Sequence, residues 1–291
     1  MPVLPPWLKA RLPSGESAAR IRAFSSRRSL STVCEQARCP NLGECWAQST
    51  ATFLVLGSSC TRACRFCSVA SSARPAPPDP REPNLLAETA ADLGLRYVVL
   101  TTVCRDDLPD QGAAHVAACI RAVKARVPGI LVEALVQDFR AEPGALREVM
   151  AAGAEVMGHN IETVERLTPV VRDRRAGYRL SLQALRAMKE LDPARRTKSS
   201  LMLGLGESSD EVETSLKDLR DAGVDIVTLG QYLRPSRQPR HLPVARYLPP
   251  EEFDRARRLA RSLGFLYVAA GPLVRSSYRA GEMLENPRTL P

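Results

Sequence analysis

Aromatic residues are scarce in this 291-residue chain, and histidine is scarcer still. Phe, Trp and Tyr make up 5% of the residues, and only three histidines occur. No basic helix interleaved with stacking side chains appears, which argues against nucleic-acid binding in spite of a net charge of +9. No apolar run has membrane-spanning length, and no secretory n-region and h-region occurs. We therefore expect a cytoplasmic protein in a reducing compartment, with no nucleic acid and no membrane among its partners.

Cysteine, by contrast, is concentrated in one place. Six of the eight cysteines form two triplets near the N-terminus. Thiolates favour soft-metal and iron–sulfur chemistry, and a four-iron cubane held by three of them keeps one iron for another ligand. The pattern predicts two clusters in an enzyme, on Cys34-x4-Cys39-x5-Cys45 and on Cys60-x3-Cys64-x2-Cys67.

Three simpler interpretations of the cysteines fit less well. Disulfides are unusual in a reducing compartment, and a chain of this length does not need them to build a core. Structural zinc requires four ligands, but His115, His159 and His241 lie far from both triplets. A ferredoxin-like carrier would need a fourth cysteine for each cluster. Cys104 and Cys119 follow no ligand spacing, and we expect Cys119 to be an ordinary buried thiol.

From residue 52 onward, short apolar runs alternate with segments of helical spacing. Such alternation predicts βαβ units around a parallel sheet. Six units are too few for a complete eight-fold barrel and favour a partial one. We expect strands at Thr52–Leu56, Tyr97–Thr102, Ile130–Val136, Ala154–Met157, Ser199–Leu203 and Asp225–Leu229, and Phe265–Ala270 is a candidate for an extra one. The expected helices are Asn84–Leu93, Ala113–Ala125, Ala145–Ala152, Arg179–Leu191, Asp210–Ala222 and Glu251–Leu263.

This layout places Cys60 in the loop after the first strand. In barrels of this kind the chemistry gathers at the carboxyl ends of the strands. Each residue there could be a helix cap or a turn residue, yet together they suit a large polar ligand. The polar residues expected at this edge are Arg105, Asp106, Asp107, His159, Asn160, Glu162, Gly204, Gly206, Glu207, Gln231 and Tyr232.

Cys-x3-Cys-x2-Cys after the first strand of a partial barrel resembles the radical S-adenosylmethionine superfamily. The resemblance implies a [4Fe–4S] cluster on Cys60, Cys64 and Cys67 whose open iron binds S-adenosylmethionine. Gly204-x-Gly206-Glu207 resembles the superfamily's glycine-rich contact to that cofactor, where glycines allow close backbone approach. Asn160 and Glu162 are further candidates for contacts with the cofactor.

The first triplet, CEQARCPNLGEC, resembles that of the lipoyl synthase family. The match continues through ATFLVLGSSCTRACRFC, RDDLPDQGAAH, HNIETV, LMLGLGE, GQYLRPS and GPLVRSSY, and covers nearly the whole chain. It implies a second, auxiliary [4Fe–4S] cluster on Cys34, Cys39 and Cys45. A serine of the Arg275-Ser276-Ser277-Tyr278 motif would be its fourth ligand, and we favour Ser277 over Ser276.

The resemblance implies the fold and the reaction together. The fold would be an α/β partial (β/α)6 barrel over residues 51–270, with an N-terminal extension over 1–50 and a C-terminal segment over 271–291. The enzyme would insert two sulfur atoms at C6 and C8 of a protein-bound octanoyl-lysine, with the auxiliary cluster as sulfur donor. Its partners would be octanoylated lipoyl carrier domains or the glycine cleavage H protein, and a reductant such as ferredoxin or flavodoxin. The net charge of +9 suits an acidic protein partner.

Some positions and alternatives stay open. The residue before Arg105 is usually Asp or Asn in the family and is Cys104 here. It could face the cofactor or be a small replacement without a role, and the second interpretation is simpler. Another radical enzyme, such as a biotin synthase-like enzyme or a methylthiotransferase, is the alternative function, as is a non-catalytic metal-binding protein.

Overall fold

The computed structural model describes residues 4–8, 31–33, 41, 45, 50–278 and 280–281. Its centre is a curved sheet in which seven strands run parallel and an eighth, short strand, β1, pairs antiparallel with β2 at one edge. The strand order follows the chain from β2 to β10, as in a barrel that stays open between its first and last strands. The strands are β1 (Ser31–Thr32), β2 (Thr50–Val55), β5 (Tyr97–Thr102), β6 (Leu131–Leu135), β7 (Val156–Gly158), β8 (Arg196–Leu203), β9 (Ile226–Gln231) and β10 (Tyr267–Gly271).

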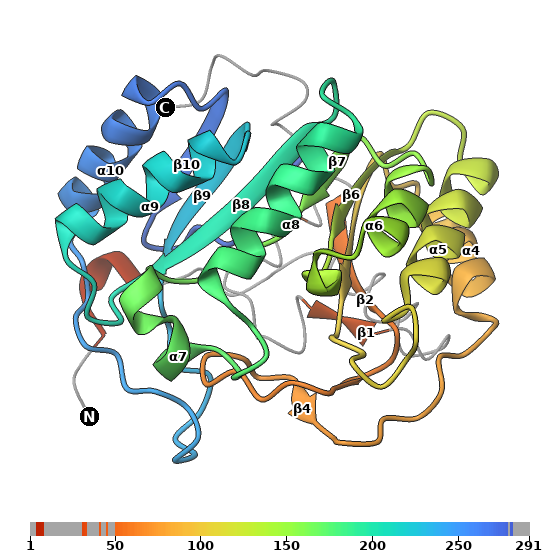
Figure 1. Cartoon of the computed structure of the whole chain (residues 1–291), viewed down its shortest axis with the longest axis horizontal. Helices are drawn as coiled ribbons and strands as arrows, with labels where there is room; N and C mark the ends of the chain where they lie inside the picture. Colours follow the sequence, from red (N-terminus) through yellow and green to blue (C-terminus); the bar gives the residue numbers. More distant parts are fainter. Residues whose placement is uncertain are drawn as a thin grey trace.

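Helices connect the parallel strands and cover the outer face of the sheet (Figure 1). The main ones are α4 (Glu82–Asp92), α5 (Ala113–Arg126), α6 (Pro143–Met150), α8 (Tyr178–Leu191), α9 (Ser209–Asp221) and α10 (Pro250–Ser262), with a short α7 (Thr168–Val171) before α8. Local sequence explains where several begin. Ser208 and Glu211 form a capping box at the start of α9, and prolines stand in the first turns of α4, α6 and α10.

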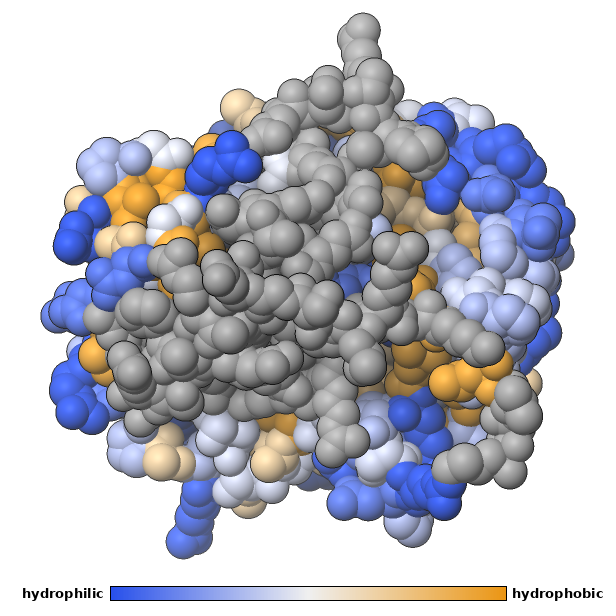
Figure 2. Space-filling view, turned by 180° about the vertical axis from the view of Figure 1, so that it is seen from behind, coloured by the Kyte–Doolittle hydropathy of each residue, from blue (hydrophilic) through white to orange (hydrophobic). Residues whose placement is uncertain are grey.

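Apolar side chains pack on both faces of the sheet. On the outer face, one cluster lies under α4, α5 and α6 and another under α8, α9 and α10. A third, smaller cluster joins Tyr97, Val99, Val156 and Tyr267 with Ala280, which comes from the segment after β10. The C-terminal segment therefore packs against the strands themselves. Seen from behind, the molecule has hydrophilic residues along its right and lower borders, with hydrophobic patches between them (Figure 2).

The sequence-based expectations for this part of the fold are confirmed. All six strands and all six helices occur at the expected places, with ends that differ by a few residues, and Phe265–Ala270 does contain a strand. The structure adds β1, the small sheet of β3 (Ser59–Cys60) and β4 (Ala70–Ser71), and the short 3-10 helix Pro6–Leu8. Trp7 anchors that helix, since its indole Nε1 donates a hydrogen bond to Leu248 O at 3.1 Å. No helix in the described part of the chain is long and apolar enough to cross a membrane.

Candidate active site

The second cysteine triplet lies in a closed loop at the carboxyl end of β2. Its first member, Cys60, belongs to β3, and β3 pairs with β4 just beyond the third member, Cys67. Ser72 N donates to Cys60 O at 2.9 Å, and Cys67 N donates to Cys64 O at 3.2 Å. The loop thus folds back on itself, and its three thiols are close enough to interact electrostatically.

Backbone amides point at the sulfur atoms. Cys60 Sγ accepts from Arg62 N at 3.3 Å and from Cys104 N at 3.2 Å, and Cys64 Sγ accepts from Asp173 N at 3.3 Å. The Cys104 thiol lies beside Cys60 and lowers the pKa of the Cys60 thiol to about 6, whereas burial raises the pKa of Cys67 to about 12. Amide donors around thiolates are typical of iron–sulfur sites, where they tune the cluster. The three sulfur atoms thus fit a soft metal cluster.

Arg62 fastens the loop to two neighbouring strands. Its guanidinium is almost fully buried and contacts two carboxylates, Asp106 after β5 and Asp138 after β6. Nη2 lies 3.0 Å from Asp106 Oδ1 and 3.0 Å from Asp138 Oδ1, while Nη1 pairs with Asp138 Oδ2. Burial alone would raise the pKa of Asp138, but the hydrogen bonds from Arg62 outweigh it and lower that pKa to about 2. The network is therefore charged at neutral pH.

Two further anchors hold the rest of the loop. Asp173, between α7 and α8, accepts from Ala63 N at 2.9 Å through its Oδ2. On the other side, His241 Nε2 contacts Cys67 O at 3.0 Å, and Leu242 N donates to Arg65 O at 3.2 Å. Loops that follow β5, β6, β7 and β9 thus all contact the cysteine loop.

Two polar residues, Asn160 and Glu162, follow the end of β7. Asn160 Oδ1 is buried with no hydrogen-bond partner among the described residues, and its Nδ2 donates to Glu162 Oε1 at 3.2 Å. Glu162 has a left-handed backbone (φ 68°), and burial raises the pKa of its carboxyl. A buried, unsatisfied carbonyl next to a carboxyl is costly unless a ligand completes it. These two side chains therefore fit the hydroxyl or amino groups of a polar cofactor.

The adjacent His159 forms hydrogen bonds with buried groups of the chain through both ring nitrogens. Its Nδ1 lies 2.8 Å from Val136 O, and its Nε2 lies 2.8 Å from Ser181 Oγ, which also accepts from Arg172. Burial lowers the pKa of His159 to about 4, so the ring is neutral at physiological pH.

The glycine-rich stretch after β8 has partners within the chain. Both carboxylate oxygens of Glu207 accept backbone amides, from Gly204 and Leu205. A Cβ on Gly204 would stand 2.2 Å from Gln231 Nε2 and 2.4 Å from Arg246 O, so this glycine permits close packing against the β9–α10 loop. A role for Gly204, Gly206 and Glu207 in cofactor binding stays a prediction.

Arg105 and its neighbours are used for structure. Arg105 is buried, pairs with Asp107 at 2.8 Å and donates to Leu56 O at 3.3 Å. Asp106 is bound by Arg62, so neither aspartate is a plain solvated turn residue. Gln231 and Tyr232 likewise hold the β9–α10 loop, through Leu248 N and Leu242 O.

The first triplet is described only in part. Cys34 and Cys39 lie outside the described residues, whereas Cys45 is buried. Asn41, between them, donates from Nδ2 to Leu273 O at 2.6 Å, and Cys45 N donates to Asn41 O at 3.0 Å. Asn41, which lies between Cys39 and Cys45 in the sequence, therefore contacts the chain just before Ser276 and Ser277, and these two serines are half-buried.

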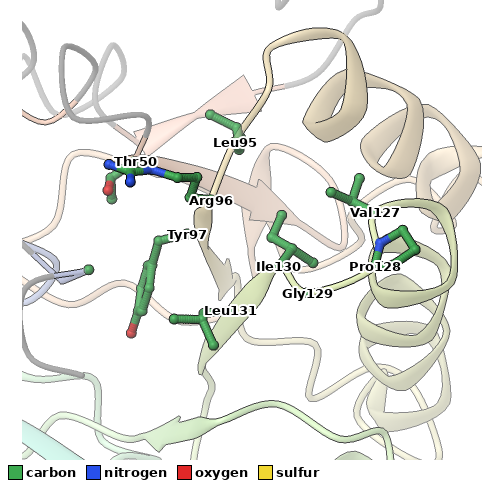
Figure 3. Close-up of a pocket in the computed structure, with 10 residues that line it drawn as sticks. Thr50, Leu95, Arg96, Tyr97, Val127, Pro128, Gly129, Ile130 and Leu131 are labelled. Atoms are coloured by element: carbon green, nitrogen blue, oxygen red, sulfur yellow. The ribbon is translucent and has the colours of Figure 1, made fainter. Parts of the chain in front are cut away.

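Two cavities lie at opposite ends of the strands. One of about 450 Å³ adjoins the cysteine loop and is lined by polar residues that include Thr61, Asp106 and Arg175. The other, of about 510 Å³, lies at the amino ends of β2, β5 and β6. Figure 3 shows its lining of Leu95, Tyr97, Ile130, Leu131 and Val127. This second lining is mostly apolar, whereas polar and charged residues line the cavity at the cysteine end.

Sequence reasoning missed the residues that hold the cysteine loop in place. Asp138 follows β6 directly, so the same strand-end rule that identified Asp106 and Asn160 also predicts Asp138. Arg62 stands between two cysteines, and only its burial reveals its role. Asp173 has no signal in the sequence, because it approaches the loop from 110 residues away.

Comparison with known proteins agrees with this geometry. The model of the Radical SAM superfamily matches residues 54–219, and that of the N-terminal domain of lipoyl synthase matches residues 1–39. The chain is 55% identical to the lipoyl synthase of Thermus thermophilus, over 95% of this chain and 85% of that one. Identity is 56% to the lipoyl synthase of Halorhodospira halophila (97% and 84% covered) and 53% to the mitochondrial lipoyl synthase of Drosophila melanogaster (96% and 75%).

Solved structures with the same fold are much more distant in sequence. The hydrogenase maturase HydG of Carboxydothermus hydrogenoformans superimposes with a TM-score of 0.55 at 11% identity, over 95% of this chain and 79% of that one. Methylornithine synthase gives 0.52 at 14% identity, over 90% and 83%. At this distance they support the fold of the chain alone.

Proposed function

The chain belongs to the lipoyl synthase family of radical S-adenosylmethionine enzymes, and we propose that it inserts two sulfur atoms at C6 and C8 of a protein-bound octanoyl-lysine. The observation that carries the proposal is the closed loop of Cys60, Cys64 and Cys67 at the carboxyl end of the first barrel strand. A four-iron cluster held by these three thiolates would keep one coordination position for a substrate or cofactor.

We propose that Cys60, Cys64 and Cys67 hold a [4Fe–4S] cluster. When reduced, that cluster with S-adenosylmethionine supplies the carbon radical needed to break unactivated C–H bonds, which no side-chain acid or base can break. The chain itself holds the three cysteines in position. The amides of Arg62, Cys104 and Asp173 donate to the sulfur atoms. The loops that follow β5, β6, β7 and β9 all contact the cysteine loop and hold it in place.

For S-adenosylmethionine itself, we propose contacts from Asn160 and Glu162. The unsatisfied Oδ1 of Asn160 is ready to accept a hydrogen bond, and Glu162 offers a second acceptor beside it. Gly204, Gly206 and Glu207 are proposed as a further contact, made by the backbone of their loop.

We propose a second, auxiliary [4Fe–4S] cluster on Cys34, Cys39 and Cys45, with Ser277 as fourth ligand. The contact of Asn41 with Leu273 supports this arrangement, because it joins the triplet to the segment that carries Ser277. A hard serine oxygen binds iron more weakly than a thiolate does, so Ser277 would be the most easily displaced of the four ligands. Replacing Ser277 with Cys should therefore block turnover while preserving the iron content, and full lipoyl formation by that variant would refute the idea.

The proposed substrates are octanoylated lipoyl carrier domains or the glycine cleavage H protein, and the proposed electron source is a reductant such as ferredoxin or flavodoxin. The whole reaction can be tested by mass spectrometry of an octanoylated carrier after incubation with the reduced enzyme and S-adenosylmethionine. Gain of two sulfur atoms is expected. An octanoyl group that stays unchanged, with an enzyme carrying about eight irons and eight sulfides per chain, would contradict the proposal.

A further inference from the structure

We propose that six arginines around the cysteine loop form a docking surface for the acidic face of the protein that carries the octanoyl-lysine. This inference rests on the proposed function, because it takes the carrier to be the substrate. The six, called the arginine rim below, are Arg65, Arg74, Arg174, Arg234, Arg237 and Arg240.

The fold brings the rim together from three distant segments. The β9–α10 loop packs on the cysteine loop, where Arg65 Nε donates to Arg240 O at 3.3 Å and Arg240 Nη2 lies 3.5 Å from Val69 O. On the other side, Arg174 lines the same cavity as Ser71 and Ser72. Figure 1 shows the two loops next to one another below the carboxyl ends of the strands.

The charge of these loops has one sign. Residues 231–248 contain four arginines and no acid, and residues 57–78 contain three arginines and no acid. Arg74, Arg174, Arg234 and Arg237 are exposed. No rim arginine forms an ion pair within the described part of the chain, although the nearby Arg62, Arg175 and Arg246 all do.

Guanidinium groups without an ion-pair partner, most of them on two loops that contain no acid, create a positive field that attracts a partner with carboxylates. Figure 2 shows hydrophilic residues along the lower border of the molecule. Such a surface suits a transient, electrostatically steered encounter rather than a permanent interface. It also lies beside the reaction centre, since the loop bearing the rim contacts Cys67 O through His241.

Two variants, each with two arginines replaced by glutamate, distinguish the effect of the rim from the effect of the net charge of the whole protein. Arg74 and Arg237 are exposed, and within the described part of the chain their side chains form no hydrogen bond or ion pair, so Arg74→Glu with Arg237→Glu should leave the structure intact. The matched control is Arg186→Glu with Arg258→Glu, two exposed arginines on the outer helices α8 and α10, which changes the net charge equally.

Affinity is measured by fluorescence anisotropy between the full-length enzyme and a labelled, octanoylated lipoyl carrier domain of net negative charge. The rim variant should bind about tenfold more weakly than wild type and lose most of its salt dependence, while the control variant changes by less than about twofold. Turnover of a short octanoylated peptide should be the same in all three proteins.

Several outcomes would overturn the proposal. Equal losses in the rim and control variants would assign the attraction to overall charge, and unchanged binding in both would exclude the rim. Tighter wild-type binding to single-stranded RNA than to the carrier would replace the protein partner with a nucleic acid. Because anisotropy needs no turnover, an enzyme that binds the carrier at the rim but adds no sulfur would refute the proposed function and leave the docking surface standing.

Discussion

Arg62 is the residue on which the geometry of the cysteine loop depends most. It pairs with Asp106 and Asp138, and side-chain exposure is at most 5% for all three. A buried charge network of this kind adds little net stability over an apolar one, but removal of one partner leaves the others uncompensated. The network therefore fixes where the loop lies more than how stable the fold is.

Replacing Arg62 with Met should leave two buried carboxylates, Asp106 and Asp138, without their shared positive partner. We expect a loss of about 3–5 kcal/mol in the free energy of unfolding, together with loss of the iron held by Cys60, Cys64 and Cys67. Urea denaturation and iron analysis measure both. The double variant Arg62→Met with Asp138→Asn should recover part of the stability, because one stranded charge is gone. Equal stability of wild type and Arg62→Met would refute the role of this network.

His159 predicts a pH dependence of stability. Burial lowers its pKa to about 4, below the value near 6.5 expected in the unfolded chain. Between these values the unfolded chain binds a proton that the folded chain rejects, so the free energy of unfolding should fall as pH drops from about 6.5 to 4, by on the order of 3 kcal/mol. Asp138 favours the protonated ring, while Arg172 and Arg62 oppose it.

The measurement is denaturant unfolding at several pH values. In His159→Asn the amide can still donate to Val136 O, but the titrating group is gone, so the slope between pH 6.5 and 5 should be shallower than in wild type. Parallel slopes in the two proteins would show that His159 does not titrate as described.

At the scale of elements, the backbone between β2 and the cysteine loop is strained at Leu56 and is held by hydrogen bonds from neighbouring segments. Leu56 has a left-handed backbone (φ 72°), which is costly for a side chain of its size. Its amide donates to Glu82 Oε2 at 2.9 Å, and its carbonyl accepts from Arg105. Glu82 is held in turn by His115 at 2.6 Å, so the first turns of α4 and α5 both fix this bend.

Glu82→Ala should leave the buried Leu56 amide without an acceptor. The expected loss is about 1–3 kcal/mol in the free energy of unfolding, with a lower iron content in the Cys60 cluster. Leu56 N and His115 Nε2 both contact Glu82 Oε2, and Glu82→Gln keeps an oxygen that can accept from both, so it should stay within about 1 kcal/mol of wild type. The clamp would be refuted if the two variants had equal stability and equal iron content.

Gly230 in β9 provides a test of the C-terminal segment. A Cβ at this position would stand 2.1 Å from Val274 O, so Gly230→Ala must displace the backbone just before Ser277. We expect the auxiliary cluster to be lost and the iron content to fall to about four atoms per chain. Gly271→Ala is the control, because its Cβ would meet only Val274 Cγ2, at 3.3 Å. If Gly230→Ala retained about eight irons, Ser277 could not be a ligand of the auxiliary cluster.

Periodicity alone located most of the elements, because buried parallel strands and amphipathic helices differ so clearly in their spacing. It could not locate β3 and β4, which are two residues each and depend on the closure of the cysteine loop. The polar strand-end residues were identified as a group, but their individual roles were not. Asp106 and His159 turned out to be bonded within the protein, while Asn160 kept an atom without a partner. Such differences depend on side-chain contacts that no sequence spacing encodes.

At the scale of the whole molecule, the fold gathers what the sequence separates. The two triplets are similar in the sequence, yet one lies in a closed loop at the carboxyl end of β2, while Asn41, between two cysteines of the other, contacts the C-terminal segment. The six arginines of the rim come from three separate segments of the sequence and lie around the cysteine loop. Radical formation, sulfur donation and carrier docking are thereby proposed for three separate parts of the molecule.

The measurement that tests this account most directly follows sulfur from the auxiliary cluster into the product. The enzyme is assembled with isotopically heavy sulfide and then incubated with reductant, S-adenosylmethionine and an octanoylated carrier in unlabelled buffer. Mass spectrometry of the carrier should show two heavy sulfur atoms in each lipoyl group, and none after Cys45 is replaced with Ala. Light sulfur in the product, or heavy sulfur from the Cys45→Ala variant, would contradict the account.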